Sequence, residues 1–151
     1  VYLKYLKNNY GALESDLYVF SDGPRTLRDE GRVSKVREII NDINGFNSIT
    51  RNVQIGNYGL ANSIIRGVTE LCDKYGKAIV VEDDLLTSPY FLRYMNQALD
   101  VYEEEDSVMH VSGYMFPIDN AQFLPDTFFL RMTSSWGWAT WQRAWNMFNP
   151  S

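Results

Sequence analysis

The chain has 151 residues, 45% of them hydrophobic and 15% aromatic, which is enough apolar material for one packed core but hardly for two. Its net charge is -5, with 14 Lys and Arg against 19 Asp and Glu, and the basic residues are scattered. Nucleic-acid binding needs a concentrated basic surface, so this balance argues against a nucleic-acid partner. No stretch approaches the roughly 18 apolar residues of a membrane span, and no signal peptide opens the sequence.

The sequence has one cysteine and one histidine, which argues against an intrachain disulfide and against a thiol catalyst. Cys72 has no partner for an intrachain disulfide, which fits a reducing compartment and predicts a cytoplasmic location. His110 lies within a strand-like apolar run and is interpreted as a satisfied interior residue. A thiol catalyst assisted by histidine is therefore disfavoured.

Both ends of the sequence look cut. Residues 1–4 begin inside a helical pattern without a cap, and residues 149–151 follow directly after another helical pattern. We therefore expect elements to be missing on each side.

Strands and helices alternate through the first half of the chain. Helices are predicted where apolar residues recur every three or four positions, and strands where short apolar runs end in turn residues. In chain order these rules predict a helix over 2–10, a strand over 17–20, a helix around 33–40 ended by Asn44-Gly45, a short strand over 48–55, and a helix from Leu60 ended by Tyr75-Gly76.

The second half begins with a wholly apolar strand over 78–81, followed by a helix that Ser88-Pro89 opens with a cap and a proline. The buried face of this helix is predicted to carry Phe91, Leu92, Met95, Leu99 and Tyr102. Further predictions are a strand over 108–111, a long loop over 114–126, a strand over 127–130 and a last helix containing Trp141 and Trp145.

The alternation of strand and helix predicts right-handed crossovers and a mostly parallel sheet, with a late strand that could run antiparallel. We expect an α/β fold in one domain over residues 1–151. It would be a Rossmann-like, mostly parallel sheet flanked by helices and incomplete at both ends.

Three consecutive acids, Glu82-Asp83-Asp84, close the apolar strand. Ligands of parallel α/β sheets collect at the carboxyl ends of strands, and three crowded carboxylates repel unless a cation joins them. Oxygen ligands favour Mg²⁺ or Mn²⁺. If the strand stays extended, Glu82 and Asp84 share one face and Asp83 points to the other. The alternative is that the acids merely cap the helix that starts near Ser88.

The order of four segments resembles the GT-A type of nucleotide-sugar glycosyltransferases, both the family 2 enzymes and the N-acetylglucosaminyltransferase I group. Each segment alone is weak evidence, and the specific feature is their combination in one order. The segments are residues 17–22, ending in Ser21-Asp22; residues 57–62, from Asn57 to Asn62; residues 80–84, Val-Val-Glu-Asp-Asp; and residues 111–114 followed by Gly137-Trp138.

The resemblance implies a role for each nucleotide-sugar-binding segment. Asp22 would face the base, although an Asp-Gly-Pro turn has an ordinary structural reading. Asn57, Gly59 and Asn62 would open a helix near a phosphate or ribose, or form a plain helix cap. The second Asn stands one residue early compared with family 2 enzymes.

The resemblance also assigns Asp84 as the direct metal ligand, with Glu82 or Asp83 meeting the ribose hydroxyls or a metal-bound water. Trp136, Gly137 and Trp138 would lie near the donor, while the remaining tryptophans pack in the core. The family's first strand is absent from this sequence. Its catalytic base follows the Gly-Trp turn and helix, so the base is expected beyond Ser151.

The expected function is a metal-dependent, inverting glycosyltransferase. It would transfer a sugar from a nucleoside diphosphate sugar, with UDP-N-acetylglucosamine as the donor that the resemblance suggests, to a glycan or glycolipid acceptor. Two alternatives stay open: a non-catalytic module that binds nucleotide sugars or glycans, and a Mg²⁺-dependent phosphoryl-transfer or receiver-type α/β domain. Receivers carry their acid pair near the first strand and a later lysine, a pattern that this sequence lacks.

Overall fold

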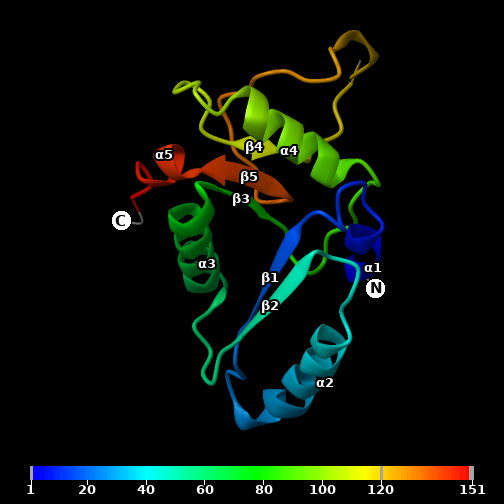
Figure 1. The fold of residues 1–151 in the computed structure, drawn as a ribbon, viewed down its shortest axis with the longest axis vertical. Helices are drawn as coiled ribbons and strands as arrows, with labels where there is room; N and C mark the ends of the chain where they lie inside the picture. Colours follow the sequence, from blue (N-terminus) through cyan, green and yellow to red (C-terminus); the bar gives the residue numbers. More distant parts are fainter. Residues whose placement is uncertain (1, 120, 150–151) are drawn as a thin grey trace.

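The computed structural model describes residues 2–119 and 121–149 (Figure 1). Expectations that concern Val1, Pro150 and Ser151 lie outside the described residues, as does Asn120 within the predicted long loop. The elements in chain order are α1 (Tyr2–Lys7), β1 (Asp16–Ser21), the short 3-10 helix η1 (Leu27–Asp29), α2 (Glu30–Asn41), β2 (Ser48–Val53), α3 (Leu60–Tyr75), β3 (Lys77–Val80), α4 (Phe91–Val101), β4 (Val111–Ser112), η2 (Ala121–Phe123), β5 (Trp138–Trp141) and α5 (Gln142–Trp145).

The strands form two small sheets. Strands β1 and β2 pair in parallel, joined by the α2 crossover, with Asp16 opposite Ser48 and Ser21 opposite Val53. The other three strands pair antiparallel in the order β3-β5-β4. The α/β class is therefore confirmed, but the expected single, mostly parallel sheet is not what the described strands form.

The main reason for this difference is β5. Residues 138–141 were expected to lie in a helix, because Trp138, Trp141 and Trp145 recur at intervals of three and four. They form a strand instead, all four residues of which are buried, and only the next four residues are helical. The strand predicted over 127–130 is not formed. The late antiparallel strand is formed by β5, which begins eleven positions after the predicted start at Thr127.

The second sheet is the middle layer of a sandwich between two helices. Side chains alternate across a strand, so neighbours in β5 enter different cores. Trp138 belongs to a buried cluster with Val68 and Cys72 of α3, whereas Ala139 and Trp141 belong to another cluster with residues of α4. Both faces of β5 are covered, so all four of its residues are buried, including Thr140, whose hydroxyl donates to the carbonyl oxygen of Met109 at 2.9 Å.

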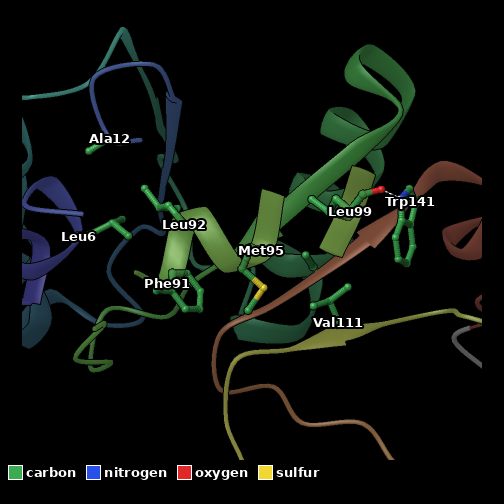
Figure 2. Close-up of a cluster of buried hydrophobic side chains, with 9 residues drawn as sticks. Leu6, Ala12, Phe91, Leu92, Met95, Leu99, Val111 and Trp141 are labelled. Carbon is green, nitrogen blue, oxygen red and sulfur yellow. Dashed lines mark hydrogen bonds between the residues drawn. The ribbon is translucent and has the colours of Figure 1, made fainter. Parts of the chain in front are cut away.

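Helix α4 has the buried face that its sequence predicts. Phe91, Leu92, Met95 and Leu99 are all buried, and Tyr102 packs against the same cluster. Figure 2 shows Leu99 beside Trp141 and Met95 near Val111, while Leu92 lies toward Leu6 and Ala12. The indole Nε1 of Trp141 donates a hydrogen bond of 2.9 Å to the carbonyl oxygen of Leu99, so the polar atom of this buried ring is satisfied.

Helix α3 ties the two sheets together. Its inner face packs on β3 through Val68 and Cys72. At Gly67 the helix also crosses the ring of Phe20 in β1, and a Cβ atom added there would lie 3.0 Å from that ring. The missing side chain therefore permits the close approach of α3 to the first sheet.

The β1–α2–β2 unit is loosely attached to the rest. In α2 only Ile40 is buried, while Val36 and Ile39 are 47% and 58% exposed, although their spacing predicted an apolar stripe. The total accessible surface is 10,614 Å², against about 7,900 Å² expected for a compact monomer of this size. The fold is thus unusually open. No helix among residues 2–119 and 121–149 is long and apolar enough to cross a membrane.

Truncating the core of α4 should be strongly destabilising. Leu99 is 1% exposed, so Leu99→Ala leaves a cavity and should lower the free energy of unfolding by about 2–5 kcal/mol. Urea denaturation followed by circular dichroism measures this change. The control is Val101→Ala in the same helix, whose side chain is 72% exposed, with an expected change within about 0.5 kcal/mol. Equal effects of the two substitutions would contradict the described packing of α4.

Candidate functional site

The carboxylate of Asp22 joins the end of β1 to the start of α3. It accepts backbone hydrogen bonds from Tyr58 and Gly59, both 2.8 Å long, and from Gly23 at 3.0 Å. Burial acts to raise the pKa of the Asp22 carboxyl, but these three amides outweigh burial and hold that pKa below its ordinary value. Asp22 is therefore an ionised clamp at the beginning of a helix.

The asparagines predicted beside this clamp strengthen it. The side-chain amide of Asn57 donates to the carbonyl oxygen of Gly23 at 3.1 Å, and that of Asn62 donates to the carbonyl oxygen of Tyr58 at 2.9 Å. Asp22, Asn57, Gly59 and Asn62 are thus brought together as the sequence predicted. Both asparagine amides donate to backbone carbonyl oxygens, so neither side chain forms the plain helix cap that was the alternative to nucleotide binding.

A polar hollow of about 140 Å³ lies beside the clamp, between the first sheet and α3. The side-chain Nδ2 of Asn52 is buried and has no hydrogen-bond partner in the described part of the chain. Arg66 stacks its guanidinium over the ring of Tyr58, 4.8 Å from the ring centre. The residues that line the polar hollow are Phe20, Asp22, Asn52, Gln54, Tyr58, Ser63, Arg66 and Glu70.

The sequence analysis named only Asp22 among these lining residues. The signal was present in β2, where Asn52 and Gln54 stand two positions apart and so point to the same face. Asn52 is also the register partner of Phe20 in β1. The polar hollow forms only because β1 pairs with β2 and brings Asn52 beside Phe20, and sequence spacing alone does not reveal this pairing.

The three acids follow β3 in a turn. The strand ends at Val80, and the amide of Leu85 bonds to the carbonyl oxygen of Glu82 at 3.4 Å, so the backbone does not stay extended through this segment. The condition under which Glu82 and Asp84 share one face is therefore not met. Asp83 and Asp84 are exposed, and no ion pair within residues 2–119 and 121–149 neutralises any of the three acids.

The arrangement of the acids bears on the expected cation. Within the described ranges no three side chains of His, Cys, Asp or Glu are grouped so as to hold a metal ion. However, Mg²⁺ at nucleotide sites is usually held by one or two carboxylates together with substrate phosphates and water, and a complete protein cage is uncommon. The oxygen donors of the exposed acid turn fit that kind of ion.

The strand register brings three of the predicted segments to one end of the second sheet. Trp138 at the start of β5 is opposite both Val80, the last residue of β3, and Ser112, the last residue of β4. The acid turn, the segment from Gly113 and the segment up to Gly137 therefore all leave the sheet at the same end. This proximity could not be read from residues 80–138 as a linear sequence.

A second hollow, of about 320 Å³, opens at this end of the sheet and is called the aromatic hollow here. Gly137 has a φ of +71°, and a Cβ atom there would lie 2.9 Å from the ring of Phe91. Its carbonyl oxygen accepts a 2.7 Å hydrogen bond from the amide of Gly113. The lining residues are Leu85, Leu86, Thr87, Ser88, Tyr90, Phe91, Tyr94, Gly113, Tyr114, Trp136 and Gly137.

The two tryptophans expected near the donor have different surroundings. Trp136 lines the aromatic hollow and is 47% exposed. Trp138 is 9% exposed, packs in the α3 cluster and stacks on His110 with ring centres 5.3 Å apart. Burial lowers the pKa of His110, and its Nε2 has no partner in the described part of the chain. His110 is thus only partly buried and has one ring nitrogen unpaired among residues 2–119 and 121–149, which differs from the satisfied interior residue that the sequence predicts.

Two other reactive groups lie outside both hollows. Cys72 is fully buried, and burial raises the pKa of its thiol to about 11, which disfavours the reactive thiolate form. On the surface, Lys74 donates a 2.8 Å hydrogen bond to the hydroxyl of Tyr18, which also bonds to Tyr75. The hydrogen bond from Lys74 is the main cause that lowers the pKa of Tyr18.

Removing the charge of the clamp should destabilise the protein. Asp22→Asn puts an amide group in place of one acceptor oxygen, so one of the backbone donors at Tyr58 or Gly59 loses its partner. The expected decrease in the free energy of unfolding is about 1–2 kcal/mol at neutral pH. Urea denaturation is the measurement, and Asp106→Asn at an exposed position is the matched control.

The same pair of proteins yields a pH dependence. Because the folded-state pKa of Asp22 is lowered, its stabilising effect is complete above the unfolded-state pKa and is lost as the pH falls through the folded-state value. The difference in stability between the unchanged protein and Asp22→Asn should therefore shrink below about pH 4. A difference that grows on acidification would contradict the ionised clamp.

Comparison with known proteins found no match to any family model, curated protein or solved structure. The interpretation of the two hollows therefore depends on the residues of this chain and on the order of its sequence segments.

Proposed function

We propose that this chain is the nucleotide-sugar-binding core of a metal-dependent, inverting glycosyltransferase of the GT-A type. The donor is a uridine diphosphate sugar, with UDP-N-acetylglucosamine as the first candidate, and the acceptor is a glycan or glycolipid. The observation that carries the proposal is the strand register at Trp138, which puts the acid turn and the aromatic hollow at one end of a sheet.

The polar hollow suits the base of such a donor. A carboxylate offers about four acceptor positions, and the backbone occupies three of those on Asp22. One position is left for a ligand N–H, such as the imide of uracil, while the unpaired Nδ2 of Asn52 supplies a donor for a ring carbonyl. At about 140 Å³ the hollow accepts one small ring system. Whole ligands usually need about 300 Å³ or more.

The acid turn suits the diphosphate through a cation. A divalent cation bound there would stabilise the two negative charges that develop on the departing nucleoside diphosphate. Asp84 is the proposed ligand, since it is exposed and forms no ion pair with a described residue. The helix start at Leu60 is less suitable for phosphate, because the carboxylate of Asp22 already occupies its amides.

The role of the chain's own residues is to bind and orient the donor. In an inverting transfer the acceptor hydroxyl attacks the anomeric carbon directly, its proton passes to a general base, and the nucleoside diphosphate departs. No described residue is assigned as that base. The parallel β1–α2–β2 crossover supports the GT-A proposal, although the second sheet is antiparallel where a mostly parallel sheet was expected.

Substitution of the proposed metal ligand should remove the metal dependence of nucleotide binding. In titration calorimetry, UDP should bind the unchanged protein more tightly with Mn²⁺ than without it. Asp84→Asn should abolish most of this gain, by at least the roughly 10- to 100-fold that outer-sphere changes produce at metal sites.

The matched control is Asp106→Asn, which removes the same charge from an exposed position after α4. It should leave the Mn²⁺ effect unchanged. Equal UDP affinity and equal Mn²⁺ dependence in Asp84→Asn and the unchanged protein would disprove the assignment of Asp84. Absence of UDP binding at any Mn²⁺ concentration would disprove the proposed donor.

A further inference from the structure

Several aromatic rings line the aromatic hollow. Trp136 and Tyr114 form one wall, with ring centres 4.6 Å apart, and Phe116 supports them at 5.8 Å from Trp136. Tyr90 lies on the α4 side and is itself packed on Tyr10, with centres 5.0 Å apart. Tyr90 is 56% exposed and Trp136 47%. Rings that are held by neighbours yet remain this accessible are suited to stack on a ligand.

Hydroxyl groups complete the lining. Thr87 Oγ1 accepts a hydrogen bond of 3.1 Å from the Asn9 amide, and Ser88 Oγ accepts one of 3.3 Å from the amide of Tyr90. Neither hydroxyl donates a hydrogen bond to an acceptor among residues 2–119 and 121–149. Their O–H groups are therefore available to a ligand that carries acceptor oxygens close to an apolar face.

The charge around the aromatic hollow disfavours an anionic ligand that arrives without a cation. None of its lining residues is Lys or Arg, and the lining begins at Leu85, directly after the acids Glu82-Asp83-Asp84. A phosphate or carboxylate would meet like charge with no compensating cation from the lining. A neutral ligand meets no such penalty.

These observations describe a partner that is neutral, ring-shaped, apolar on one face and rich in hydroxyl oxygens. A pyranose sugar has these properties, and about 320 Å³ lies at the lower end of the volumes of small-ligand sites. We infer that the aromatic hollow binds a neutral hexopyranose, stacked on Trp136 with its hydroxyls toward Thr87 and Ser88. In the proposed function this ring is the accepting end of the glycan, but the binding itself requires neither nucleotide nor metal.

The test uses saturation-transfer NMR with methyl α- and β-hexopyranosides of the gluco, galacto and manno series, without nucleotide or metal. At least one glycoside should bind with a Kd of about 1–10 mM, and the signals should be strongest for ring hydrogens of one face. Trp136→Ala should weaken binding roughly tenfold. Trp136→Phe, which keeps an aromatic face, should retain most of it.

The control is Phe123→Ala, which removes an aromatic ring that is 81% exposed and does not line the aromatic hollow. It should leave glycoside binding unchanged. No signal for any glycoside, or equal losses in Trp136→Ala and Phe123→Ala, would overturn the inference. If no glycoside binds and Trp136→Ala instead makes an oligomer monomeric, the hollow is a contact between copies of the chain. Because no UDP is present in these samples, glycoside binding can be measured even if the proposed UDP donor is wrong.

Discussion

The burial of both faces of β5 determines where every other part of the second sheet can lie. Trp138 and Trp141 are three positions apart, so they point to opposite sides of the strand and need separate cores. Helix α3 supplies one core and α4 supplies the other. Because β5 is also the central strand, its first residue lies opposite the last residues of β3 and β4. The packing of two indole rings is therefore linked to the geometry of the candidate site: the acid turn and both glycine segments leave the sheet at one end.

The helices were largely predictable from sequence, whereas strand pairing was not. The buried face of α4 and the end of α3 at Gly76 follow from apolar spacing and capping residues, which are local properties. The sequence does not distinguish the last strand from a helix, because tryptophans at intervals of three and four fit a helix as well as a strand that is buried on both faces. A two-faced strand has no polar alternation to distinguish it. The antiparallel direction of β5 depends on contacts with residues about sixty positions earlier, and no local pattern contains that information.

The candidate site was predictable in its polar residues and not in its cavities. Asp22, Asn57 and Asn62 attract notice because short polar side chains beside glycine mark turns and helix starts, and they do meet in space. The hollow next to them is built by Asn52, Gln54 and Arg66, which look like ordinary surface residues until β1 pairs with β2 and α3 crosses Phe20. The acids illustrate the opposite case. Their position after a strand is confirmed, but only Ala78 of β3 is buried, and the turn at Glu82 changes which side chains share a face.

The weak attachment of the β1–α2–β2 unit should make local opening of this part of the chain easier. Four residues that line the polar hollow lie in β1 and β2 or directly after them, and the other four lie in α3 or in the segment just before it. The polar hollow therefore lies between the loosely attached β1–α2–β2 unit and the better packed helix α3. Local opening costs less free energy where few apolar side chains are buried. Backbone amides of β1 and β2 should then exchange with solvent deuterium faster than those of β5. A small ring bound in the polar hollow would contact both the β1–α2–β2 unit and α3, and it should slow amide hydrogen exchange in β1 and β2.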